Sequence, residues 1–259
     1  MAPLTRPRAG ETIRILGAFV GLWFLSSCAT RGPLHIYSAT KSSLGNLTDT
    51  GPDGEARGPS FLAAGETLTG LAYDPFTDHL FLRLAPGNLI RVIDRPAGKL
   101  KREFIIAEAS AMGGGDLAVR PRDGHLFLLD PDGAEIIETS RHGKFIRRWA
   151  LAAGSGRAAG LAYDVRRDQL LVLSTGESAT VTAYDRAGGT AGQASLGSGG
   201  NFSSLAYDSA TEEFYAANFT TGSIDVFGRD GVFRRKILPP GNEIVPFVDV
   251  GERSFLRIF

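Results

Sequence analysis

The sequence has very little cysteine and no excess of charge of either sign. Its 259 residues contain one cysteine, Cys28, and its 28 basic residues balance 28 acidic residues. A single cysteine excludes an internal disulfide framework and any zinc site built from several cysteines. Balanced charge argues against a general nucleic-acid-binding protein, which is normally basic. We therefore expect no nucleic acid among the partners of this chain.

Long apolar runs are also lacking. The apolar segment at residues 15–25 is too short to span a bilayer comfortably, because a spanning helix takes about 20 apolar residues. It follows three basic residues, Arg6, Arg8 and Arg14. A positive start followed by a short apolar core is typical of a secretory signal. We predict that residues 1–27 are a signal peptide, either helical or disordered.

The tetrapeptide at residues 25–28, LSSC, closes this segment. It resembles the lipobox of bacterial lipoproteins. The resemblance implies that the peptide is cut before Cys28, that the Cys28 thiol carries a diacylglycerol, and that residues 28–33 form a lipidated tether. Ala29 in place of aspartate favours the outer membrane, facing the periplasm, in a Gram-negative host. The alternatives are an ordinary signal peptide with an incidental cysteine and an uncleaved anchor.

Beyond the tether the chain is rich in glycine and repeats one pattern. The 33 glycines, with β-branched and aromatic residues between them, indicate short strands joined by tight turns. The pattern occurs as LAYDPFTDHLFLRL from Leu71, LAVRPRDGHLFLLD from Leu117, LAYDVRRDQLLVLS from Leu161 and LAYDSATEEFYAAN from Leu205. A fifth copy begins near Phe247 and ends with the sequence. Each copy predicts two strands around a turn opened by aspartate or proline.

Two further strands follow each complete copy, and four strands in every 44 residues or so indicate a β-propeller blade. We predict an all-β fold, a single propeller of five four-stranded blades over residues 34–259, and a monomer. The predicted blades are 69–114, 115–158, 159–202, 203–245, and a last blade made of 246–259 together with 34–64. Six blades would need an extra blade from residues 34–70, which are too few.

The last blade is predicted to close the ring with strands from both termini. The segment LHIYSA at residues 34–39 aligns with the third strands of other blades, and we expect it to pair beside SFLRIF at residues 254–259. The fourth strand is expected near residues 44–50 or 60–64. In this arrangement the tether enters from the face formed by the loops between strands two and three.

The repeat LAYDxxxxxLxLx resembles the NHL and YVTN class of bacterial propellers, over residues 34–259. This class includes protein-binding scaffolds, ligand-binding modules and a few enzymes such as lactonases, so the resemblance implies a fold more than a function. We expect a non-enzymatic, lipid-anchored platform that binds a protein or a small molecule. The alternative is a metal-assisted hydrolase or lyase acting on a small periplasmic metabolite.

Ligands are expected on the face formed by the loops between strands two and three. On that face Asp116 and Asp130 of one blade differ from mostly neutral counterparts, and Asn218 lies at a related position. These three residues are the candidate site for a divalent cation, and we expect no other cofactor. The alternative is that Asp130-Pro131-Asp132-Gly133 is simply a turn, in which aspartate bonds its own backbone.

No catalytic residues can be assigned, because no acid, base and nucleophile stand in a recognisable relation. His79 and His125 occupy equivalent positions at the start of strand two, which places them on the opposite face.

The predicted outer strands of blades one, two and four each carry three cations, at Lys99, Lys101 and Arg102, at Lys144, Arg147 and Arg148, and at Arg234, Arg235 and Lys236. These cations either protect exposed sheet edges or form a basic rim for an anionic partner, and edge protection is the favoured interpretation.

Overall fold

The structure is a computed structural model that describes residues 32–39, 47–55, 67–109, 114–130, 132, 134–152, 156–198, 200–239 and 244–253. The described residues form 19 β-strands and no α-helix. They therefore contain no helix that could cross a membrane. The predicted signal peptide and Cys28 lie outside the described residues.

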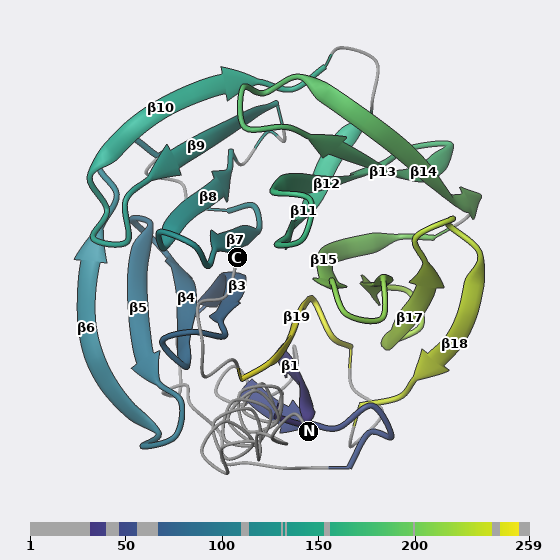
Figure 1. Cartoon of the computed structure of the whole chain (residues 1–259), viewed down its shortest axis with the longest axis horizontal. Coiled ribbons are helices and arrows are strands. Elements are labelled where there is room, and N and C mark those ends of the chain that lie inside the picture. Colours follow the sequence, from purple (N-terminus) through teal and green to yellow (C-terminus); the bar gives the residue numbers. More distant parts are fainter. Residues whose placement is uncertain are drawn as a thin grey trace, which may run out of the picture.

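Five sheets are arranged like blades around a central axis, as Figure 1 shows. Four of them are antiparallel sheets of four strands, which confirms the predicted all-β, five-bladed propeller. Blades one and two contain β3 (Thr67–Asp74), β4 (His79–Ala85), β5 (Leu89–Asp94) and β6 (Lys99–Ile105), then β7 (Leu117–Arg120), β8 (His125–Leu129), β9 (Glu135–Thr139) and β10 (Phe145–Ala150). Blades three and four contain β11 (Arg157–Asp164), β12 (Gln169–Thr175), β13 (Ser178–Tyr184) and β14 (Thr190–Ser198), then β15 (Phe202–Asp208), β16 (Glu213–Asn218), β17 (Ser223–Gly228) and β18 (Phe233–Ile237).

The last blade joins the two ends of the described chain. Its three described strands are β19 (Phe247–Glu252), β1 (Leu34–Ala39) and β2 (Leu47–Thr50), hydrogen-bonded in that order. In the β1–β19 ladder Ser38 lies opposite Val248, and on the other side of β1 it lies opposite Thr48. Closure of the ring by strands from both termini is therefore confirmed.

The position of β1 within this blade corrects the prediction. Residues 34–39 form the second strand, next to the innermost strand β19, and not the third. Both edges of β1 are occupied, by β19 and by β2. Residues 254–259 themselves lie outside the described residues, as do residues 60–64, one of the two predicted positions of the fourth strand. The other predicted position, residues 44–50, contains β2, the third strand of this blade.

Contacts between blades set the register of the fifth copy. The alanine of the LAYD motif packs against the next blade, as Ala118 does in one cluster with Leu161 and Tyr163. Ala206 packs in the same way with Val248 and Val250. Val248 is thus the equivalent of the motif leucine, so the fifth copy begins one residue later than Phe247. It follows that Asp249 takes the place of the motif alanine.

The inner strands approach one another closely just before the motif leucine. A Cβ atom added to Gly160 would lie 2.5 Å from the backbone nitrogen of Leu205, closer than real Cβ contacts. At the equivalent positions of blades two and four the chain has Asp116 and Ser204 instead. Their side chains therefore lie near the axis of the propeller, where the innermost strands enclose the narrow end of a central channel.

The cations of the outer strands mostly find partners inside the protein. Arg147 pairs with Glu138 at 2.6 Å and Arg235 with Glu213 at 2.7 Å, each within its own blade. Lys101 lies 2.8 Å from the ring of His79, which is the first residue of β4. The two arginine–glutamate pairs neutralise part of the basic charge, which favours edge protection over a basic rim.

Candidate binding site in the central channel

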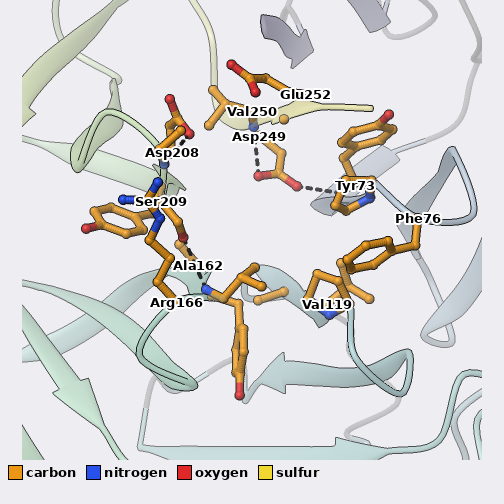
Figure 2. Close-up of a pocket in the computed structure, with 18 of the residues that line it drawn as sticks. Tyr73, Phe76, Val119, Ala162, Arg166, Asp208, Ser209, Asp249, Val250 and Glu252 are labelled. Atoms are coloured by element: carbon orange, nitrogen blue, oxygen red, sulfur yellow. Dashed lines mark hydrogen bonds between the residues drawn. The ribbon is translucent and has the colours of Figure 1, made fainter. Parts of the chain in front are cut away.

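A cavity of about 510 Å³ lies on the axis of the propeller. Its walls come from the innermost strands and from the turns that connect strand one to strand two. All five blades contribute to it, through Phe76, Pro121, Val165, Ala210 and Gly251 among others. Figure 2 shows side chains from several blades facing this common space. A volume of this size is typical of small-molecule sites.

The cavity is formed at the end of the channel opposite to the predicted ligand face. Ligands were expected on the face formed by the loops between strands two and three and by the connections from one blade to the next, the face to which Asp116, Asp130 and Asn218 were assigned. None of these three residues lines the cavity, whose mouth is formed by the strand one to strand two turns. Those turns are ordered by the motif aspartates: Asp164 accepts a hydrogen bond from the backbone of Arg166 at 3.0 Å, and Asp208 from that of Ala210 at 2.8 Å.

Asp116 closes the narrow end of the channel. It is fully buried, and its Oδ2 accepts hydrogen bonds from the Ser204 hydroxyl at 2.8 Å, from the Leu161 amide at 3.1 Å and from the Leu205 amide at 3.3 Å. Its Oδ1 accepts one from the Leu117 amide at 3.0 Å. Burial raises the pKa of Asp116 to about 7, although the four donors oppose that rise. The carboxyl group of Asp116 therefore links blades two, three and four, and both of its oxygens already accept hydrogen bonds from the protein.

Asp130 and Asn218 are held by local bonds in separate turns. Asp130 accepts a hydrogen bond from the Asp132 amide at 3.0 Å, the arrangement expected for a simple turn. Asn218 accepts bonds from the amides of Thr220 and Thr221 and donates to Asp225 at 2.8 Å. In the described part of the chain, none of these three side chains is hydrogen-bonded to another of the three. In the described part of the chain, no three His, Cys, Asp or Glu side chains are grouped closely enough to hold a metal ion.

A protein cation already lies near two of these candidates. Arg83 is fully buried, and burial lowers its pKa to about 10, while the charges of Asp116 and Asp130 act in the opposite sense. Its Nη1 donates to the carbonyls of Leu129 at 2.6 Å and Gly115 at 3.0 Å, which joins blade one to blade two. Sequence reasoning missed Arg83. The signal was one arginine inside the apolar strand HLFLRL.

Asp249 lies in the cavity itself. Its carboxyl group points into the channel and accepts hydrogen bonds from the backbone amides of Tyr73 and Val250, the latter at 2.8 Å (Figure 2). Burial raises the pKa of Asp249 to about 8, with a smaller contribution from the charge of Asp116. The residue keeps some contact with cavity solvent, because it is only partly covered. The sequence analysis did not identify this residue either. The feature that could have revealed it is an aspartate at the position where the other copies of the repeat have alanine.

The start of β1 shows where the N-terminal segment joins the ring. Leu34 lies opposite Glu252 and Ala39 opposite Phe247, so β1 begins at the end of the channel that holds the cavity mouth. The amide of Gly32 donates to the carbonyl of Arg253 at 3.3 Å on that same side. The predicted side of attachment was therefore wrong, because β1 is the second strand of its blade and runs opposite to a third strand.

Comparison with known proteins identifies the fold alone. No protein-family model matches this chain, and a search of curated proteins finds no match. Among solved structures, a chain of a nidogen/laminin complex superposes with a TM-score of 0.59 and 12% sequence identity, covering 84% of this chain and 98% of that one. At this level of identity the likeness supports a β-propeller scaffold and says nothing about the ligand.

Proposed function

We propose that this protein is a non-enzymatic binding module of the cell envelope that holds a small molecule in its central cavity. The observation that carries the proposal is the cavity of about 510 Å³, to which all five blades contribute. Its wall is mainly apolar, with a few polar groups such as Asp249 and Arg166, the composition typical of ligand sites. The NHL and YVTN resemblance of the repeat is compatible with such a module.

The proposal includes a lipid anchor at Cys28, supported by the LSSC motif and the apolar segment before it. Three residues separate Cys28 from Gly32, and the four steps from one Cα atom to the next reach about 13 Å at about 3.3 Å per residue. Since Gly32 bonds Arg253 beside the cavity mouth, the mouth would face the membrane. In a Gram-negative host this would be the periplasmic side of the outer membrane.

The hydrolase or lyase alternative has less support. It rests on a cation at Asp116, Asp130 and Asn218, whose oxygens accept hydrogen bonds from separate groups of the protein. A divalent cation needs several oxygens converging on one point. The carboxyl group of Asp249, which lies in the cavity, is bonded to backbone amides and to no described base or nucleophile.

The proposal predicts that the protein purified from membranes carries a small molecule, which mass spectrometry detects after denaturation. An Ala210→Trp variant should lose that molecule, because Ala210 lines the cavity mouth and a tryptophan there would block it. Ala187→Trp, in an exposed turn of blade three, is the matched control and should keep it. A Cys28→Ser variant should leave the membrane fraction.

Two results would contradict the proposal. One is that no molecule is released from any preparation. The other is that the same molecules are released from the Ala210→Trp and Ala187→Trp variants in equal amounts, which would place them outside the cavity.

A further inference from the structure

We propose that the ligand of the central cavity is an organic ammonium ion, whose charged end pairs with the carboxyl group of Asp249 while its apolar body fills the channel. This inference rests on the proposed function, because it assumes that the cavity binds a small molecule. Three observations lead to it: the position of Asp249 in the repeat, the lack of a cation beside it, and the charge of the cavity wall.

The position of Asp249 singles it out from the repeat. The other four blades place Ala72, Ala118, Ala162 and Ala206 at this point, where a methyl group packs against the next blade. Alanine therefore satisfies the packing of an inner strand. An aspartate there adds a carboxyl group that the scaffold does not require, and Figure 2 shows this group directed into the channel. A charged group in an enclosed space costs free energy unless it gains a partner.

Among the described residues, no cationic side chain is hydrogen-bonded or ion-paired to this carboxyl group, whose donors are backbone amides. The described strands that pack most closely against β19 are β1, β3, β15 and β16. Their titratable side chains are His35, Tyr37, Tyr73, Asp74, Tyr207, Asp208, Glu213 and Tyr215. The one group among them that can become cationic, His35, bonds Asp49 at 2.7 Å. The charged neighbour that does act on Asp249 is Asp116, which has the same sign.

The wall of the cavity also favours a cation. It contains four acidic residues, Asp168, Asp208, Asp249 and Glu252, against the two arginines Arg122 and Arg166. Apolar groups make up most of the remainder, including Phe76, Val119 and Val250. Aromatic and aliphatic walls suit the apolar body of a ligand, and an aromatic ring attracts a cation that lies over its face. A small amine with one apolar group matches both properties.

Binding of such a ligand should depend on pH in a defined direction. The carboxyl of Asp249 is largely protonated at neutral pH, because its pKa is raised to about 8. An ammonium ion favours the ionised carboxylate, so binding releases a proton from Asp249. Affinity should therefore rise about fiftyfold from pH 6 to pH 8, because the ionised fraction of a carboxyl group with a pKa of about 8 rises by that factor.

The experiment is calorimetric titration of the full chain with benzylammonium and with its neutral analogue benzyl alcohol, at pH 6 and pH 8. Asp249→Ala is the test variant, because alanine occupies this position in every other blade and should preserve the fold. Glu252→Gln is the matched control, since it removes the same charge from the cavity mouth. Both variants are checked for an unchanged circular dichroism spectrum.

The inference predicts that benzylammonium binds more tightly at pH 8 than at pH 6, and that Asp249→Ala weakens it at least tenfold at pH 8. Glu252→Gln should change it much less, and benzyl alcohol should bind the parent and Asp249→Ala equally. If benzyl alcohol binds as well as benzylammonium, or if Asp249→Ala leaves benzylammonium binding unchanged, the inference is wrong while cavity binding stands. If neither probe binds, the inference is also wrong. The proposed function is tested independently, by whether the protein purified from membranes releases a small molecule.

Discussion

An Ile36→Asp variant is expected to lose more than about 4 kcal/mol of the free energy of unfolding, a large part of the roughly 5–15 kcal/mol typical of native proteins. Ile36 is fully buried, with 0% of its surface exposed, in the cluster that holds the last blade against blade four. It belongs to β1, whose pairing with β19 closes the ring. An aspartate there would bury a charge without a partner in the strand that joins both ends of the fold.

Leu100→Asp is the matched control for this variant. Leu100 lies on the outer strand of blade one with 56% of its surface exposed, so the same chemical change should alter the free energy of unfolding by about 0.5 kcal/mol or less. Urea unfolding followed by circular dichroism measures both. If Ile36→Asp were as mild as Leu100→Asp, residues 34–39 would not be part of the ring and the closure described above would be incorrect.

The propeller is expected to lose stability as the pH rises from 5 to 8, because of Asp249 and Asp116. Their pKa values are raised in the folded protein, to about 8 and about 7, from 3.8. In this range the folded state therefore holds protons that the unfolded state has released, and the free energy of unfolding falls with pH. The stabilisation is complete below pH 3.8 and is lost as the pH passes each raised pKa.

An Asp249→Ala variant isolates this effect. Between pH 5 and pH 8 its free energy of unfolding should fall by about 3 kcal/mol less than that of the parent, since each pKa unit corresponds to about 1.4 kcal/mol. The lowered pKa of His79 acts in the opposite sense below pH 6.5, but it is common to both proteins and cancels in the difference. Parallel urea titrations at both pH values provide the measurement. Identical pH dependence in the two proteins would contradict a raised pKa at Asp249.

The repeat was sufficient to predict the ring, but not the place of every strand in it. Three copies of LAYD and the related LAVR, each followed by an apolar strand, identified four of the blades, because each copy builds the same inner pair of strands. The assignment of residues 34–39 failed because the second and third strands of a blade are both covered on two faces. Their apolar patterns, as in HLFLRLA of β4 and LIRVID of β5, are too similar to distinguish by hydrophobicity.

The candidate site was harder to predict than the fold. Asp116 and Asp130 stand out in the sequence. In the structure, however, Asp116 bonds Ser204 across the axis of the ring, and Asp130 bonds the backbone of its own turn. The cavity depends on how five inner strands converge, which no single segment reveals. Its most informative residue, Asp249, could be found only after the fifth copy was aligned correctly, and a one-residue error in that alignment hides the substitution of alanine by aspartate.

The most direct test of the account is the titration of the Asp249 carboxyl group by carbon-13 NMR, assigned from the peak that disappears in Asp249→Ala. The account predicts a pKa near 8 without ligand, and a lower pKa when benzylammonium saturates the protein. The result that would contradict the account is a carboxyl group that is already ionised at pH 5 and whose titration benzylammonium does not change. Asp249 would then not be a protonated acid that ionises when a cationic ligand binds.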